Sequence, residues 1–158
     1  CGAREVERLK QLVATEREYG VDPDALRRLA AMLPAVPPVA EAVAARLRLS
    51  RRQRERLACA AARDARDANA PRALAYREGR ECATDRLLLG GIDPAGLRDW
   101  DIPTLPLKGG EIVERGVAKG PEVARILQAV ERRWIDEGFP DLARVEKLLD
   151  EELADRRA

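Results

Sequence analysis

The residues best suited to chemistry lie between positions 106 and 127, where two short helical patterns flank a glycine-bounded turn. Gly116 suits the left-handed residue that ends a helix, and Gly120 followed by Pro121 suits the start of the next one. The exposed N–H groups of a first helical turn form a ready site for anions. The cationic residues on or beside this turn are Lys108, Arg115 and Lys119.

Two interpretations of this hairpin are open. Any helical hairpin needs a residue that stops the first helix and one that starts the second, and residue chemistry alone favours that structural role. The alternative is a contact to the phosphate backbone of a nucleic acid, which would position the RNA without reading its bases.

A second group of cations opens a predicted helix after Ser50. Most arginines between positions 51 and 66 are expected to pair with Glu55, Asp64 and Asp67 on a solvated face. The exceptions lie in the first turns, where we expect no nearby acid. These candidates for RNA contact are Arg51, Arg52 and Arg54.

Residues 106–127 read P-L-K-G-G-E-I-V-E-R-G-V-A-K-G-P-E-V-A-R-I-L and are followed by the segments 129–134 and 138–140. In this order they resemble the C-terminal signature of bacterial tRNA nucleotidyltransferases, the CCA-adding enzymes, which form one family with bacterial poly(A) polymerases. Residues 45–57 resemble a helical junction of that family, and the similarity covers the chain from about Leu26 onward. Glu111 stands where the family more often carries Asp, which keeps the charge.

The resemblance implies that the chain grips the backbone of tRNA and so holds the RNA 3′ end in an N-terminal catalytic domain of the same protein. The RNA-binding residues it suggests are Lys108, Arg115, Lys119 and Gly120, with Arg51 and Arg54 behind them. One alternative is the equivalent region of a poly(A) polymerase. Another is a helical protein-interaction module without an RNA role, which the net charge of +1 favours.

The catalytic head of the family carries paired carboxylates that hold magnesium, and we find no such pair in its proper context here. Asp22 and Asp24 have the spacing but open a helix, with Asp22 expected as N-cap and Pro23 as first helical residue. Asp99 and Asp101 flank a tryptophan before a proline-rich loop. We therefore expect no catalytic residue and no bound cofactor in this chain, which begins with Cys1 and reads as a C-terminal fragment. Mg²⁺ and CTP or ATP are implied only for the full-length enzyme.

Composition predicts an all-α fold. Hydrophobic residues make up 46% of the 158 residues, aromatics only 3% and charged residues 36%, a mixture of Ala, Leu, Arg and Glu that favours helices. Alternating β-branched runs are missing. We expect an irregular multi-helix bundle that ends in a helical hairpin, with a body at residues 1–91 and a tail at 92–158, or one continuous domain.

Local patterns add four expectations about elements. Ser50 and Gln53 should form a capping box. Pro71 should open one helix that runs to Leu89, and Trp134 should lie in the core. Cys59 and Cys82 are expected to be small buried apolar residues.

The chain has three cysteines, no C-x-x-C motif and no histidine, so we expect no zinc site, and a reducing cytoplasm fits. No apolar run approaches the ~20 residues of a membrane span.

Overall fold

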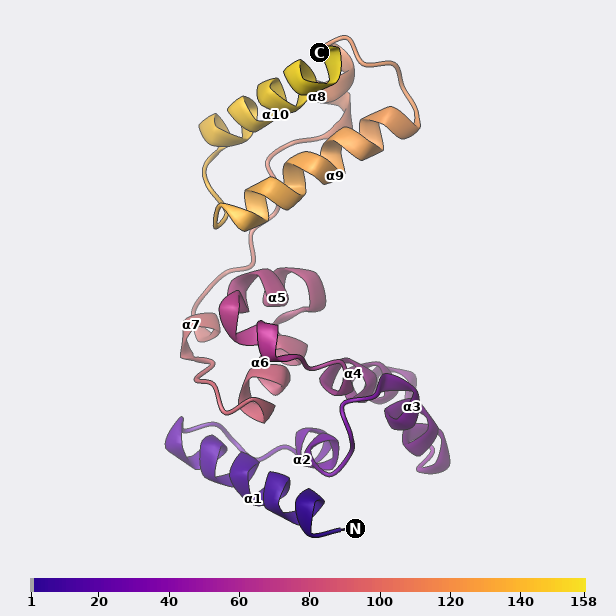
Figure 1. The fold of residues 1–158 in the computed structure, drawn as a ribbon, viewed down its shortest axis with the longest axis vertical. Coiled ribbons are helices and arrows are strands. Elements are labelled where there is room, and N and C mark those ends of the chain that lie inside the picture. The colour runs from indigo at the N-terminus through magenta and orange to yellow at the C-terminus, as the bar shows by residue number, and fades with distance from the viewer. Residues whose placement is uncertain (1) are drawn as a thin grey trace. The chain divides into compact units, whose positions relative to one another are not determined.

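The structure is a computed structural model that describes residues 2–158 (Figure 1). Over this range the chain is all-α, with helices, one short 3-10 helix and no strand. The predicted fold class is therefore confirmed. The physical reason is the composition, because Ala, Leu, Arg and Glu lose little side-chain freedom in a helix.

Two compact units divide the chain after Ile102. The first unit holds α1 (Ala3–Glu18), α2 (Ala25–Ala31), α3 (Pro37–Arg46), α4 (Arg51–Ala61), the 3-10 helix η1 (Ala65–Asn69), α5 (Pro71–Glu78), α6 (Arg80–Leu89) and α7 (Ala95–Arg98). The second unit holds α8 (Gly109–Glu114), α9 (Pro121–Asp136) and α10 (Leu142–Arg157).

The boundary lies later than the predicted one at residue 91, and α7 explains the difference. Leu97 of α7 is buried in one cluster with Ala75, Ala83 and Leu87, and Trp100 packs against that cluster. Residues 92–102 therefore belong to the first unit. The glycine pair at 90–91 ends α6 without ending the domain.

Small side chains build most of the first core. Ala40 and Ala44 of α3 face Leu57, Ala60 and Ala61 of α4 in one buried cluster. Because alanine adds only a methyl group, the two helices can approach closely. The low aromatic content of the sequence thus produces close helix contacts rather than a core filled by large rings.

A buried ion network joins four helices of the first unit. Arg27 of α2 donates from Nε to Asp85 Oδ1 of α6 at 2.9 Å and from Nη1 to Glu16 Oε1 of α1 at 3.0 Å. Arg56 of α4 donates from Nε to Asp85 Oδ2 at 2.8 Å and from Nη2 to Asp85 Oδ1 at 3.0 Å. The side chains of Glu16 and Asp85 are almost fully buried, so their charges depend on these partners.

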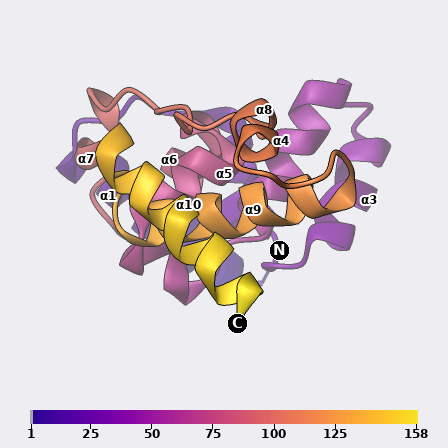
Figure 2. The same ribbon diagram turned by 90° about the horizontal axis from the view of Figure 1, so that it is seen from above.

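The second unit is built on α9 and α10, which lie side by side in Figures 1 and 2 with α8 beside α9. Its core comes from the apolar stripe of α9 and from Val145, Leu148 and Leu149 of α10. Trp134 is buried as expected, and its Nε1 donates to the carbonyl of Pro140 at 2.9 Å. The ring of Phe139 meets Trp134 edge-on at 4.9 Å, which fixes the turn into α10.

Three predicted helix boundaries can be compared with the structure. The capping box of Ser50 and Gln53 is present. The N-cap of α2 is Asp24, which accepts from the N–H of Arg27, so the assignment of Asp22 was wrong by two residues. The single helix expected from Pro71 to Leu89 is broken at Gly79, whose φ of 87° and ψ of 158° lie in a region open essentially to glycine alone.

Removing one acid from the ion network should destabilise the protein strongly. Asp85→Ala would leave Arg27 and Arg56 without their shared partner, and we expect a loss of about 3–5 kcal/mol in the free energy of unfolding. Urea denaturation measures this. Glu55→Ala is the matched control, because its pair with Arg51 is exposed and should contribute less than about 1 kcal/mol. Equal losses in the two variants would contradict the role given to Asp85.

Gly79→Ala tests the break between α5 and α6. Open space surrounds the position of an added Cβ, so the whole effect must come from the backbone, and we expect a loss of about 1–3 kcal/mol. Gly96→Ala in α7 also adds a methyl group in open space but has no positive φ, and it should be neutral or slightly stabilising. Thermal unfolding of both variants would show a fault in this explanation if Gly79→Ala were as stable as Gly96→Ala.

Candidate nucleic-acid interface

The predicted glycine-bounded hairpin is present. Helix α8 ends at Glu114, and Gly116 follows with a φ of 95°. Gly120 is the N-cap of α9, with a φ of 138° and a ψ of −156°, and Pro121 is the first helical residue. Because this conformation excludes a Cβ, glycine is required where the chain enters α9. Gly120 has no side chain that could cap the first turn, but its backbone carbonyl accepts from the N–H of Val123 at 3.2 Å.

The turn between α8 and α9 is open to solvent. Lys108, Lys119 and Gly120 are all exposed. Across residues 2–158 neither lysine takes part in an ion pair. Two predicted contact residues thus present free charges next to an uncapped helix start, and the hairpin is not packed beneath neighbouring side chains.

Arg115, in contrast, is already engaged. Its Nη1 forms an exposed ion pair with Asp150 of α10, which an RNA phosphate would have to displace, so the predicted contact at Arg115 stays a prediction. The ion pair depends on tertiary packing, because α10 places Asp150 beside the C-terminal end of α8. The first turn of α9 also carries its own carboxylate, Glu122, which pairs with Arg156 and lies 3.5 Å from Arg125.

Charge differs between the two units. Residues 103–158 contain 10 basic and 12 acidic residues, a net charge of −2, whereas residues 1–102 contain 19 basic and 16 acidic residues, a net charge of +3. An anionic ligand is therefore attracted more strongly by the first unit. Within the second unit, Lys108 and Lys119 are the unpaired cations that lie beside the start of α9.

The strongest cationic surface lies where α3 turns into α4, and we call it the arginine corner. No acid occurs between Glu41 and Glu55, and Arg48 has a φ of 53° in the connecting turn. The arginines of this corner are all exposed: Arg46, Arg48, Arg51, Arg52 and Arg54. Our sequence analysis singled out the last three and missed the first two, although the acid-free stretch was a visible signal.

One expectation for this corner was wrong. Arg51 was thought to lack an acid, but its Nε donates to Glu55 Oε1 at 2.9 Å. The side chain of Arg51 is still 92% exposed, so this pair is weak and easily exchanged. Arg54 makes only a long contact of 3.5 Å from Nε to the carbonyl of Leu49. In the described part of the chain, the remaining arginines of the corner form no ion pair.

Other arginines of the basic middle point inward and serve the fold. Arg63 donates to the carbonyl of Leu33 at 2.8 Å, and burial lowers the pKa of its guanidinium. Arg86 pairs at 2.7 Å with Asp67, whose side chain is nearly buried, so Asp67 does not belong to a solvated face as expected. Arg66, in contrast, is exposed and pairs with Asp64 at 2.9 Å on a solvated face, as expected; this hydrogen bond lowers the pKa of Asp64 to about 2.

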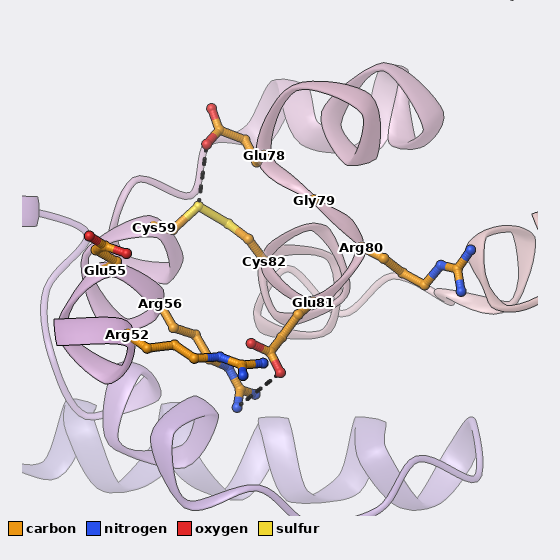
Figure 3. Close-up of a pocket in the computed structure, with 9 residues that line it drawn as sticks. All are labelled: Arg52, Glu55, Arg56, Cys59, Glu78, Gly79, Arg80, Glu81 and Cys82. Atoms are coloured by element: carbon orange, nitrogen blue, oxygen red, sulfur yellow. Dashed lines mark hydrogen bonds and ion pairs between the residues drawn. A yellow bond between two sulfur atoms is a disulfide. The ribbon is translucent and has the colours of Figure 1, made fainter. Parts of the chain in front are cut away.

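Behind the arginine corner, α4 and α6 border a groove of about 360 Å³. A disulfide joins Cys59 of α4 to Cys82 of α6 in its floor (Figure 3). Only Cys82 is buried, whereas Cys59 is partly exposed. The expectation of a small buried residue is confirmed for Cys82 and wrong for Cys59. The disulfide was not expected, because the break at Gly79 brings the first turn of α6 against α4, which sequence spacing did not show.

Three atoms in this groove could hold a metal ion if the disulfide were reduced. Cys59, Cys82 and Glu78 place their ligand atoms within 4.8 Å of one another. This donor set suits a soft ion and does not fit Mg²⁺, which prefers oxygen ligands. Asp24, one acid of the spaced pairs noted in the sequence, caps α2 and pairs with Arg56 at 3.0 Å.

No helix between residues 2 and 158 is both long and apolar enough to cross a bilayer.

Comparison of the chain with models of protein families finds no match, and comparison with curated proteins finds no match either. The resemblance to CCA-adding enzymes therefore depends on the sequence motifs described above, and its functional content is a proposal.

Proposed function

We propose that this chain binds the phosphate backbone of RNA, as the helical body and tail of a tRNA nucleotidyltransferase of the CCA-adding kind. The observation that carries RNA binding is the arginine corner, where five exposed arginines lie within nine residues without an intervening acid. The choice of tRNA as ligand comes from the sequence resemblance.

The arginine corner has the chemistry of a backbone site. Guanidinium groups match phosphate oxygens in a two-pronged geometry. Each neutralised phosphate releases condensed counterions, which drives binding without reference to base sequence. Within residues 2–158, four of the five side chains have no ion pair to break, so little free energy is lost when they turn toward a ligand.

The hairpin of the second unit offers a weaker contact of the same kind. Lys108 and Lys119 supply free charge, and no side chain caps the first turn of α9, although the N–H of Val123 already donates to the Gly120 carbonyl. Glu122 opposes an anion at the same helix start, so the macrodipole alone is not sufficient. The lysines must therefore provide most of the attraction at this point.

In this proposal the chain positions the RNA and supplies no catalytic residue. A nucleotidyl transfer gains several orders of magnitude when the attacking hydroxyl is held correctly. A grip on the tRNA backbone would hold the 3′ end in a catalytic domain that supplies magnesium and the nucleoside triphosphate. The residues described here would act only as RNA-binding groups.

The arginine corner can be tested by charge reversal. Arg52→Glu with Arg54→Glu should weaken tRNA binding and reduce the slope of log affinity against log salt by about 2, because each lost phosphate contact removes about 1. Fluorescence titration of labelled tRNA at several salt concentrations measures both effects. The matched control is Lys10→Glu with Arg98→Glu, which makes the same charge change at exposed positions of the same unit.

The outcomes of this titration separate the rival functions. Equal slopes for the two double variants would remove the arginine corner from the binding site. Complete lack of salt-sensitive tRNA binding by the wild-type chain would overturn the proposal and favour a protein-interaction module. An adenylate oligomer of matched length, included as competitor, should compete poorly, whereas effective competition would favour the poly(A) polymerase alternative.

The hairpin needs a separate variant because its contribution is smaller. Lys119→Glu should lower tRNA affinity and reduce the salt slope by about 1. Lys147→Glu, an exposed lysine on α10, provides the same charge change in the same unit and should leave the slope near its wild-type value. If the two lysine variants bind tRNA alike, the hairpin has no part in the grip.

A further inference from the structure

The disulfide between Cys59 and Cys82 is a second link between α4 and α6, which the ion pair of Arg56 with Asp85 already joins. The Cα atoms of the two cysteines lie 6.1 Å apart, within the range that a disulfide can span without backbone movement. The residues are 23 positions apart in sequence. The enclosed segment contains η1 and α5, so the bond closes these elements into a loop anchored on α4 and α6.

The two sulfur atoms differ in access. Cys82 is 6% exposed, whereas Cys59 is partly exposed and borders the open groove. A thiol arriving from solvent can therefore reach the sulfur of Cys59 and not that of Cys82. Exchange depends on which sulfur can be attacked. An external thiol therefore attacks Cys59, and Cys82 is the leaving group.

Glu78 lies at the same sulfur. Its Oε2 is 3.6 Å from Cys59 Sγ, and Figure 3 shows the carboxylate directed at that atom, with Arg80 pointing away from the disulfide. In the reduced protein the Cys59 thiol can donate a hydrogen bond to this carboxylate. A negative charge in that position favours thiol over thiolate and so stabilises the reduced form relative to the disulfide.

We propose that Cys59 and Cys82 form a reversible thiol–disulfide exchange site whose substrates are small-molecule thiols and disulfides. In reduction, a thiolate attacks Cys59 Sγ, the bond to Cys82 breaks, and Cys82 leaves as a thiolate that takes a proton from solvent. A second thiolate then attacks the external sulfur of the mixed disulfide and releases Cys59 as a thiolate, which takes up a proton. The external thiols leave as one oxidised disulfide, so two electrons and two protons reach the protein.

The state of this site should control how firmly the enclosed segment is held. Without the disulfide, the segment keeps the pair of Arg86 with Asp67 and the packing of Ala75 against Ala83 and Leu87. Reduction therefore loosens residues 62–78 without unfolding the unit. This inference is independent of RNA binding, because it concerns only the cysteines and their neighbours.

The test uses the whole chain with Cys1→Ser, which leaves only the two cysteines of the site. The protein is equilibrated in buffers of graded reduced and oxidised glutathione, quenched with an alkylating agent and weighed by mass spectrometry. We expect both thiols to disappear together, with the mass of the internal disulfide, and limited proteolysis within residues 62–78 to slow as they do. Glu78→Gln should move the midpoint roughly two- to tenfold toward more reducing buffers.

Each alternative result has a definite meaning. The variant Cys59→Ser should collect no stable glutathione adduct on the buried Cys82, whereas Cys82→Ser should collect one on Cys59, and the reverse pattern would overturn the proposed direction. Two thiols that stay reduced in fully oxidised buffer would overturn the site itself. So would one equivalent of tightly bound Zn²⁺ that prevented closure, because the cluster would then be a metal centre.

Discussion

The first unit depends on the carboxylate of Asp85, a charge placed where water cannot reach it. A buried charge is tolerated only when its partners are complete. Asp85 draws Arg27 from α2 and Arg56 from α4, and Arg27 in turn holds Glu16 of α1. Four helices must reach their final positions together for every member to be satisfied. Alanine-rich helices could slide over one another at little cost, and this network fixes their register.

The orientation of α4 follows from the same constraint. Arg56 must face Asp85, and the hydrogen bonds that it donates to Asp85 raise the pKa of Arg56 above its ordinary value, so this guanidinium stays charged. Leu57 and Ala60 then face α3, and the first turn of α4 carries its arginines outward. The arginine corner is therefore the solvent-facing side of α4, whose other side packs against α3 and pairs with Asp85.

Sequence reasoning succeeded where the signal was local. The capping box at Ser50, the glycine stop at Gly116 and the proline start at Pro121 each depend on residues within one helical turn, and all three were predicted. It failed where a distant element decided the outcome. Asp150 reaches Arg115 across 35 positions, and Cys82 meets Cys59 only because Gly79 redirects the chain. The sequence pattern could not reveal these pairings, since charge and spacing along one helix do not show which helix packs against it.

A near-neutral chain can carry a strong local field, because ion pairing removes charges unevenly. The arginines that meet Asp85, Asp67 and Glu16 add little to the outer potential, as do most of those in the second unit. Among the cations of residues 2–158 without an ion pair, the densest group lies at residues 46–54. Helix α4 is held at its start by the capping box, in its middle by Arg56 and near its end by Cys59. Charges on so firmly held a helix lose less conformational entropy when they meet a ligand, which makes this corner a better anion surface than its net charge indicates.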